Sequence, residues 1–254
     1  MNLFDLSGQV AIVTGSSRGI GCAIAERLAE HGARVVISSR KQDACEPVAA
    51  AINERHGAAR AIAVAANISS KEALRGLVDA ALAAFGRVDT LVCNAASNPY
   101  YGPMADISDE QFRKILDNNV VSNHWLISMC MPHMIEAKRG SVIIVSSVAG
   151  LKGNATIGAY GVSKAADMAL ARNLAHEYGP HGVRVNCIAP GLIRTDFARA
   201  LLEDPERLER VNKQVPLRRV GEPDEIAGAA VFLASPAGNF VTGTTLVCDG
   251  GATI

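Results

Sequence analysis

The feature that most constrains the fold is a regular alternation of short β-branched runs and longer alanine-rich stretches with helical periodicity. The strand-like runs are apolar on both faces, as parallel strands covered by helices on both sides must be. The expected strands are 10–13, 34–38, 61–65, 90–93, 141–146, 184–188 and 245–247. The expected helices are 21–31, 42–56, 71–85, 109–137, 160–178 and 223–234. This order predicts one α/β domain over residues 1–254, a doubly wound parallel sheet with helices on both faces.

Composition excludes several classes of function. Lys+Arg and Asp+Glu balance at 25 each, so no nucleic-acid surface is expected. Six cysteines without a CxxC pair read as reduced thiols, and six histidines without an HExxH motif give no metal site. No apolar run is long enough for a membrane span, and the amino terminus lacks the order of a signal peptide. We therefore expect a cytoplasmic protein with neither a membrane nor a nucleic-acid partner.

One stretch breaks the alternation. The segment between Pro190 and Pro223 is charged and only weakly periodic, where a compact connection would need a few residues. Long segments beyond the end of a strand frequently cover a substrate. We predict a substrate lid over residues 192–222, with a purely structural connection as the alternative.

A glycine-rich turn, TGSSRGIG at residues 14–21, lies between the first expected strand and the first expected helix. Glycines let the backbone approach a diphosphate, and the N–H groups at the start of a helix attract an anion. A structural turn is the alternative reading. The predicted dinucleotide contacts in this turn are Gly15, Ser17, Arg18, Gly19 and Ile20.

The end of the second expected strand indicates which dinucleotide binds. An acidic residue there would hold the ribose hydroxyls and repel a 2′-phosphate. The sequence has Ser39 and Arg40 instead, with Arg18 able to reach the same place. Two guanidiniums without a carboxylate favour NADP(H), with NAD(H) as the alternative.

Three residues suggest proton-transfer chemistry. Tyr160 and Lys164 are four residues apart at the start of an expected helix and therefore share one face. The lysine ammonium is expected to lower the pKa of the tyrosine, making it a general acid or base. Ser147 follows the expected strand 141–146, at the edge where ligands of such sheets bind, and can hold the substrate oxygen.

These motifs together resemble the short-chain dehydrogenase/reductase family over essentially the whole chain. The likeness rests on the TGSSRGIG turn, Asn94-Ala95-Ala96, the SSVAG serine, YGVSK, and Ala-Pro-Gly at 189–191. The resemblance implies a Rossmann-type fold of about seven strands. It also implies hydride transfer between NADP(H) and a carbonyl or alcohol substrate. The segment NAASNPYYGPM resembles the carbonyl-reductase branch, which acts on ketones, aldehydes and quinone-like compounds.

The resemblance also assigns further residues. It makes Asn119, rather than adjacent Asn118, the fourth catalytic residue, which holds a water on the lysine. The chain departs from the family pattern at Ala96, usually glycine, and at Asn67, usually acidic. The other implied cofactor contacts are Ile68, Asn94, Ala95, Tyr160, Lys164, Pro190, Gly191, Ile193 and Thr195. The candidate substrate contacts are Ser97, Tyr100, Tyr101, Ser147, Tyr160, Leu192 and Phe197.

Family members are mostly tetramers or dimers that pair through the helices around Asn119 and Tyr160, so a homo-oligomer is expected. Two other functions remain open. A 3-oxoacyl-[acyl-carrier-protein] reductase would dock its acidic carrier on basic residues near the active-site mouth, for which Lys138 and His181 are the candidates. An NADP-sensing regulator would bind the cofactor without turnover, although such proteins typically lose the tyrosine or lysine.

Overall fold

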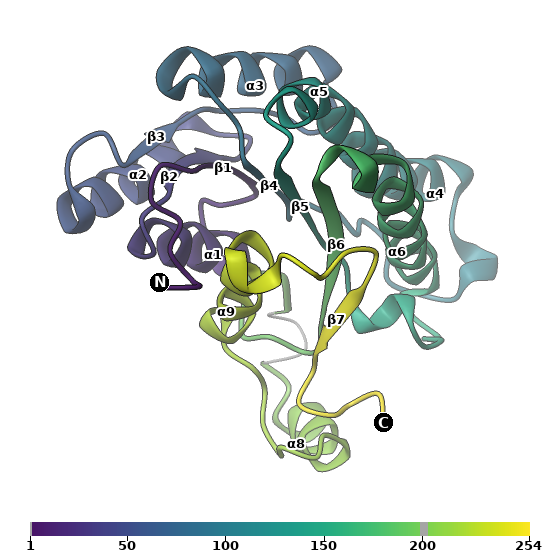
Figure 1. Cartoon of the computed structure of the whole chain (residues 1–254). Helices are drawn as coiled ribbons and strands as arrows, with labels where there is room; N and C mark the ends of the chain where they lie inside the picture. Colours follow the sequence, from purple (N-terminus) through teal and green to yellow (C-terminus); the bar gives the residue numbers. More distant parts are fainter. Residues whose placement is uncertain (1, 199–202) are drawn as a thin grey trace.

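The computed structural model describes residues 2–198 and 203–254, without the side chains of Phe197 and Arg207. Its centre is one seven-stranded parallel sheet with the strand order β3-β2-β1-β4-β5-β6-β7 (Figure 1). The order reverses between β1 and β4, which is the switch point at which open α/β sheets bind their ligands. The predicted doubly wound, Rossmann-type sheet is therefore confirmed.

The elements follow the predicted alternation. The strands are β1 (Val10–Thr14), β2 (Arg34–Ser38), β3 (Ala61–Ala63), β4 (Thr90–Cys93), β5 (Gly140–Val145), β6 (Val183–Pro190) and β7 (Thr245–Cys248). The α-helices are α1 (Gly19–Glu30), α2 (Gln42–His56), α3 (Lys71–Phe85), α4 (Asp109–Leu116), α5 (Ser122–Glu136), α6 (Gly158–Tyr178), α8 (Pro205–Gln214) and α9 (Pro223–Ala234). Short 3-10 helices cover Met104–Asp106, Val148–Gly150, Gly179–His181, Asp196–Ala198 and Pro236–Gly238.

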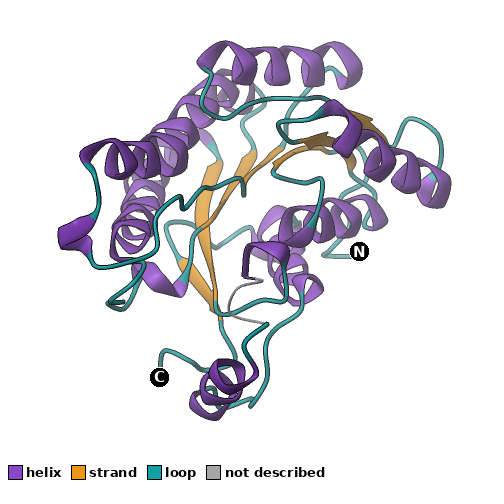
Figure 2. Cartoon of the chain, turned by 180° about the vertical axis from the view of Figure 1, so that it is seen from behind, coloured by secondary structure: helices purple, strands orange, loops and turns teal. Residues whose placement is uncertain are grey.

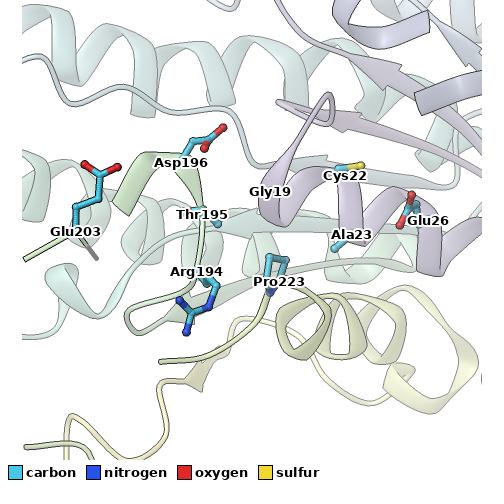
Figure 3. A pocket seen from close by; sticks show the side chains of 9 residues that line it. All are labelled: Gly19, Cys22, Ala23, Glu26, Arg194, Thr195, Asp196, Glu203 and Pro223. Carbon is cyan, nitrogen blue, oxygen red and sulfur yellow. The ribbon is translucent and has the colours of Figure 1, made fainter. Parts of the chain in front are cut away.

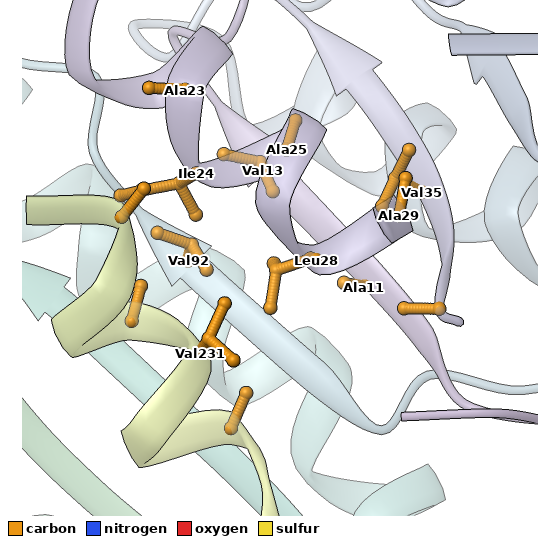
Figure 4. Close-up of a cluster of buried hydrophobic side chains, with 14 of the residues drawn as sticks. Ala11, Val13, Ala23, Ile24, Ala25, Leu28, Ala29, Val35, Val92 and Val231 are labelled. Atoms are coloured by element: carbon orange, nitrogen blue, oxygen red, sulfur yellow. The ribbon is translucent and has the colours of Figure 1, made fainter. Parts of the chain in front are cut away.

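Helices cover both faces of the sheet (Figures 1 and 2). Helices α1, α2 and α9 pack on one face, where Ile24 and Leu28 of α1 meet strand residues such as Val13 and Val92 (Figure 4). Helices α3, α5 and α6 pack on the other face, against the alternate residues of the same strands, such as Ile12 and Leu91. Two-sided burial is what the doubly apolar strand runs require.

Local signals set several helix ends. The Ser70 hydroxyl accepts a hydrogen bond from the Ala73 N–H at the start of α3, and Gly86 ends that helix in the left-handed region. Ser108 and Gln111 form a reciprocal capping box at the start of α4. These residues explain why the observed bounds of α3 and the start of α4 agree with the predicted ones.

The predicted continuous helix 109–137 is wrong in one place. A π-helical segment, Asp117–Val121, separates α4 from α5. It contains the adjacent, buried Asn118 and Asn119, whose side chains bond to Ser97 on the loop after β4. The two amides thus turn towards the sheet edge, which an uninterrupted apolar helix face would not accommodate.

Strand β3 ends at Ala63 and is thus shorter than the predicted 61–65, although the Val64 N–H still donates to the Ile37 carbonyl of β2. The predicted lid begins with a bridge between Ile193 and Gly221 and includes helix α8, which lies apart from the main body near the C-terminus (Figure 1). Residues 199–202 of this segment lie outside the described residues.

Among the described residues, no helix is both long and apolar enough to cross a membrane. Nor does any group of three or more His, Cys, Asp or Glu residues in this part of the chain form a candidate metal site.

Candidate active site

The glycine turn joins β1 to α1 and is tied to the neighbouring strand. Gly15 has a φ of +65°, and a Cβ there would lie 2.8 Å from Nδ2 of Asn94. That Nδ2 donates to the carbonyls of Thr14 (2.9 Å) and Gly15 (3.2 Å), while the Asn94 N–H donates to Thr14 Oγ1 (3.0 Å). Asn94 therefore joins the ends of β1 and β4, and only glycine fits at position 15.

The first turn of α1 suits an anionic group such as a dinucleotide diphosphate. Arg18 precedes the helix without a side-chain cap, and the first turn contains no acidic residue. The first N–H groups of an α-helix have no partner within the helix, so an uncapped start is suited to a phosphate. Gly19 has a φ of +60° and faces Thr195, whose Cγ2 would lie 3.4 Å from a Cβ at position 19. The predicted contacts of the turn and of Thr195 therefore lie together.

A cleft of about 560 Å³ lies between α1 and the start of the lid segment (Figure 3). Thr195 and Asp196 form one side, and Gly19 and Cys22 form the other. Burial, with a smaller contribution from the charge of Glu26, raises the pKa of the Cys22 thiol to about 11, so this cysteine is not a reactive thiolate. The four catalytic candidates lie outside this cleft.

The residues predicted to determine specificity for NADP(H) over NAD(H) follow the ends of β1 and β2. Arg40 is exposed just beyond β2, and Ser39 Oγ lies 3.3 Å from the Lys41 carbonyl oxygen and 3.1 Å from Cys45 Sγ. Arg18 is also exposed, but its Nη1 donates to Oδ2 of Asp196 at 3.0 Å. Asp196, in the segment predicted to be a lid, thus holds one of the two predicted phosphate-binding arginines.

The other predicted cofactor contacts follow β3, β4 and β6. Asn67 has its amide oxygen engaged by the Ser69 N–H at 3.1 Å. The Ala95 N–H donates to Thr14 Oγ1 at 3.1 Å, and Gly191 directly follows β6. Ser17, Ile20, Ile68 and Ala96 are half-buried, whereas Pro190 and Ile193 are buried.

Tyr160 and Lys164 lie one turn apart at the start of α6, as predicted. Lys164 Nζ is 5.6 Å from the centroid of the Tyr160 ring. Ser147 follows β5 in a different part of the chain, accepts the Ala149 N–H at 3.1 Å and is hydrogen-bonded to Tyr160. The fold therefore brings the three predicted residues together at the carboxyl edge of the sheet.

The predicted lowering of the Tyr160 pKa is not found. Burial raises the pKa of Tyr160 most strongly, and the negative charge of Asp167 adds to the rise. The ammonium of Lys164 and the hydrogen bond from Ser147 lower the pKa without offsetting burial. The lysine acts in the expected direction, but the pKa of the ligand-free tyrosine stays above its ordinary value.

Lys164 is almost fully buried. Its Nζ donates to the Val145 carbonyl at the end of β5 (2.9 Å) and to Asp167 Oδ2 (3.0 Å). Burial by itself lowers the pKa of Lys164, but the charges of Asp167 and Tyr160 outweigh it and raise the pKa above its usual value. The lysine is therefore protonated at neutral pH.

Asn119 lies in the π-helical segment and is fully buried. Its Oδ1 accepts the Ser97 N–H (2.8 Å), and its Nδ2 donates to the Ser97 carbonyl (3.0 Å) and to Ser163 Oγ (3.0 Å). The backbone carbonyl of Asn119 accepts Nδ2 of Asn123 at 2.6 Å. Asn119 thus orders the loop after β4 and the start of α6.

The candidate substrate residues divide into two groups. Tyr101 is exposed, and its charge is the weakest of the influences that raise the pKa of Tyr160. Tyr100 instead donates its hydroxyl to the Pro103 carbonyl of its own loop (2.8 Å), and Ser97 is bonded to Asn118 and Asn119. Leu192 follows Gly191 at the start of the lid, and the side chain of Phe197 lies outside the described residues.

The sequence analysis did not identify two buried polar residues, Asp167 and Asn123, beside the four predicted catalytic residues (the tetrad of Asn119, Ser147, Tyr160 and Lys164). Nδ2 of Asn123 donates to Asp167 Oδ1 at 3.1 Å. Their spacing in the sequence could have indicated this position. Asp167 follows Lys164 by three residues and Asn123 follows Asn119 by four, and residues at these spacings share one face of a helix.

Comparisons with known proteins agree with this geometry. Residues 15–253 match a family profile described as enoyl-(acyl carrier protein) reductase. The chain is 42% identical over 247 residues to dehydrogenase/reductase SDR family member 4 of Oryctolagus cuniculus, covering 97% of this chain and 94% of the relative. It is 41% identical over 249 residues to the human dehydrogenase/reductase SDR family member 2, mitochondrial, covering 98% and 88%.

The chain belongs to the short-chain dehydrogenase/reductase family. It is an NAD(P)-dependent oxidoreductase.

Solved structures of family members superpose over nearly the whole chain. A gluconate 5-dehydrogenase from Burkholderia cenocepacia in complex with NADP and tartrate has a TM-score of 0.94 at 32% identity, covering 99% of this chain and 98% of that one. A 7α-hydroxysteroid dehydrogenase complexed with NADH and 7-oxoglycochenodeoxycholic acid has a TM-score of 0.94 at 37% identity, covering 98% and 96%. The family therefore includes members that bind either nicotinamide cofactor.

One expectation about a family alternative is corrected by the fold. Lys138 and His181 were expected near the active-site mouth, but they precede β5 and β6, which begin at Gly140 and Val183. The tetrad lies at the opposite, carboxyl ends of these strands, because all strands of the sheet are parallel. Within one chain the two basic residues therefore lie at the edge of the sheet opposite Tyr160.

Proposed function

We propose that this protein transfers a hydride between NADP(H) and the carbonyl carbon of a ketone, aldehyde or quinone-like compound, or the reverse. The observation that carries the proposal is the cluster of Ser147, Tyr160 and Lys164 at the carboxyl edge of the sheet. A tyrosine hydrogen-bonded to a serine, with its ring 5.6 Å from a buried ammonium, is a group that can donate a proton and accommodate the phenolate left behind.

Each residue has a defined role in this mechanism. The glycine turn and the residues after β4 and β6 would hold the nicotinamide cofactor, which would supply or accept the hydride. Tyr160 protonates the carbonyl oxygen in reduction and removes the hydroxyl proton in oxidation. Ser147 holds that oxygen beside the tyrosine. Lys164 stabilises the phenolate electrostatically, and Asn119 orders the surrounding backbone through Ser97.

NADP(H) is the proposed cofactor because the turns that follow β1 and β2, where the adenosine ribose would bind, contain two arginines and no acidic residue. Arg40 is exposed directly after β2, and Arg18 projects from the glycine turn. Two guanidiniums can bind a 2′-phosphate with charge-assisted hydrogen bonds. Asn67 would receive the adenine with its N–H donors, since its amide oxygen is bonded to Ser69.

The segment 192–222 is proposed as the substrate lid. It continues from Gly191 at the carboxyl edge of β6, and the bridge between Ile193 and Gly221 joins its two ends. Leu192 and the side chains of α8 such as Val211 border a second cavity of about 470 Å³. The apolar wall of this cavity, together with exposed Tyr101, favours a substrate with an apolar body.

Assembly and location are also inferred. Val162 of α6 is an exposed apolar residue, which is compatible with a dimer or tetramer formed through the two long helices. The free, mostly buried cysteines of the described chain suit a reducing compartment, and we propose the cytoplasm.

The decisive experiment compares Tyr160→Phe with Tyr178→Phe, a control at the other end of the same helix. We expect Tyr160→Phe to lower kcat/KM for carbonyl reduction by about 10³-fold, because general acid catalysis is lost, and Tyr178→Phe to have little effect. Turnover should be followed with NADPH and NADH over a panel of ketones, β-keto esters, quinones, sugars and steroids. Undiminished turnover of Tyr160→Phe would overturn the mechanism, and cofactor binding without any turnover would favour a sensor.

A further inference from the structure

Asp167 is a buried carboxylate next to the reaction centre that the proposed mechanism does not use. It lies three residues after Lys164 in α6 and is 0% exposed. Each of its carboxylate oxygens accepts a hydrogen bond from a buried side chain: Oδ2 from Lys164 Nζ (3.0 Å) and Oδ1 from Asn123 Nδ2 (3.1 Å). A carboxylate with two such donors is satisfied without water.

The hydrogen bonds continue beyond Asp167 to a second helix. Nδ2 of Asn123, in α5, also donates to the backbone carbonyl of Asn119 at 2.6 Å. Lys164 is therefore connected to Asn119 through the side chains of Asp167 and Asn123. The family resemblance assigns Asn119 to hold a water on the lysine, but here two protein side chains join these residues.

We propose that Asp167 is a positioning residue of the proton-transfer site, which holds the Lys164 ammonium in place and supplies its counter-charge, while Asn123 holds Asp167. The inference rests on the proposed function, in which Lys164 acts on Tyr160. Asp167 itself touches neither the substrate oxygen nor the tyrosine hydroxyl in this account, and it acts through the lysine.

The effect of Asp167 on neighbouring pKa values predicts the direction in which its removal shifts proton loss. The negative charge of Asp167 raises the pKa of Lys164 and also raises the pKa of Tyr160. Removing that charge must therefore make the first proton leave the Tyr160–Lys164 pair at a lower pH, whichever of the two groups loses it.

The other titratable groups around the pair do not supply this charge. Cys93 of β4 and Cys187 of β6 approach from the sheet, and Tyr101 approaches from the loop after β4. Burial raises the pKa of Cys187 to about 12 and that of Cys93 well above its usual value, so both thiols are neutral in the working range. Among the described residues that face the pair, Asp167 is therefore the carboxylate. Burial raises the pKa of Asp167, whereas the charge of Lys164 and the hydrogen bonds from Lys164 and Asn123 lower it and favour its ionised form.

The test is the pH profile of kcat/KM for carbonyl reduction in Asp167→Asn, which keeps the shape of the side chain and removes its charge. Reduction needs the pair fully protonated, so the profile falls on the alkaline side. We expect this fall to move about one to two pH units lower in Asp167→Asn and to return towards the wild-type position in Asp167→Glu. Cys187→Ala is the matched control: Cys187 Sγ lies 3.4 Å from the Asp167 carbonyl, so the variant changes local packing without removing a charge, and its profile should not move.

A readout without turnover accompanies the profile. The protein has four tyrosines, so labelling tyrosine at Cζ and lysine at Cε with ¹³C allows Tyr160 and Lys164 to be titrated by NMR in the cofactor-free protein. The first proton loss from the pair should occur at lower pH in Asp167→Asn than in wild type.

The outcomes separate this inference from the proposed function. If Tyr160→Phe retains turnover, the proposed mechanism fails, whatever Asp167→Asn does. If Tyr160→Phe is inactive but the profile and the titration of Asp167→Asn match those of wild type, only the role of Asp167 is overturned. A uniform loss of activity in Asp167→Asn without a shift along the pH axis would likewise mean that Asp167 merely supports the fold.

Discussion

Two ion pairs of this protein have the same length and opposite surroundings. Lys164–Asp167 and Arg18–Asp196 both measure 3.0 Å, but the side chains of the first are 2% and 0% exposed and those of the second 72% and 44%. Water screens the exposed pair, so either partner can exchange it for another charge. The buried pair has no such substitute, because separating it would leave a charge without solvent.

The difference suggests two different uses of the same chemistry. The buried pair maintains a fixed charge beside Tyr160 throughout the reaction. The exposed pair holds Arg18 against the lid segment until an anionic ligand, such as the 2′-phosphate of the cofactor, competes for it. Four experiments test this distinction.

Breaking the buried pair should have the largest effect. We expect Lys164→Met to lower kcat/KM by about 10³-fold and to destabilise the protein by about 3 kcal/mol, because Asp167 is left buried without its counter-charge. Urea unfolding measures the loss of stability. The double variant Lys164→Met with Asp167→Asn should recover most of the stability but none of the activity, and failure to recover stability would mean that the two residues are not energetically coupled.

Removing Arg40, which belongs to neither ion pair, should have the next largest effect, on KM for NADPH. Arg40→Ala is expected to raise KM for NADPH about tenfold and to change KM for NADH little, because one charge-assisted contact to the 2′-phosphate is lost. Steady-state kinetics with each cofactor measure this difference. Equal effects on both cofactors would contradict the assignment of Arg40 to the phosphate.

Releasing Arg18 from Asp196 should have a smaller effect on KM for NADPH, and in the opposite direction to that of Arg40→Ala. We expect Asp196→Asn to lower KM for NADPH about threefold, because an exposed ion pair competes only weakly with the phosphate. KM for NADH should not change. An unchanged or higher KM for NADPH would mean that Asp196 does not compete for Arg18.

A change in salt concentration should have the smallest effect on the kinetics, and it distinguishes the exposed ion pair from the buried one. Raising the salt concentration from about 0.05 M to about 0.5 M should abolish the advantage of Asp196→Asn, since screening at high ionic strength weakens exposed pairs. The shift of the pH profile in Asp167→Asn should survive, because the buried pair is little screened. The same salt series on both variants provides the comparison, and loss of both effects would show that the Asp167 pair is accessible to ions.

The sequence was sufficient for the sheet, the glycine turn and the tyrosine, serine and lysine, because each rests on local patterns. Short apolar runs rich in β-branched residues favour buried strands, and a Tyr-x-x-x-Lys spacing on a helix places both side chains on one face. The elements meet at one edge because parallel strands all end there. Five predicted elements have the observed bounds: the strands 34–38 and 90–93 and the helices 42–56, 71–85 and 223–234.

What could not be predicted depends on packing between distant segments. Arg18 and Asp196 are 178 residues apart, and no local pattern pairs them. Nothing in the local sequence around Asp167 marks it as buried, and its burial results from the packing of α6 against β6 and the π-helical segment. The same burial reverses the expected direction of the Tyr160 pKa, since desolvation is a property of the assembled core.

The π-helical segment Asp117–Val121 has a consequence for how this site can evolve. Such a segment commonly corresponds to one extra residue within an α-helix, and each residue of an α-helix turns the chain by about 100°. Deleting a single residue here would restore a regular helix and rotate α4 away from α5 by that angle. Asn119 would then no longer face Ser97, and α4 would lose its register against α6. The length of the chain in this segment is therefore as strictly constrained as the identity of Asn119 itself.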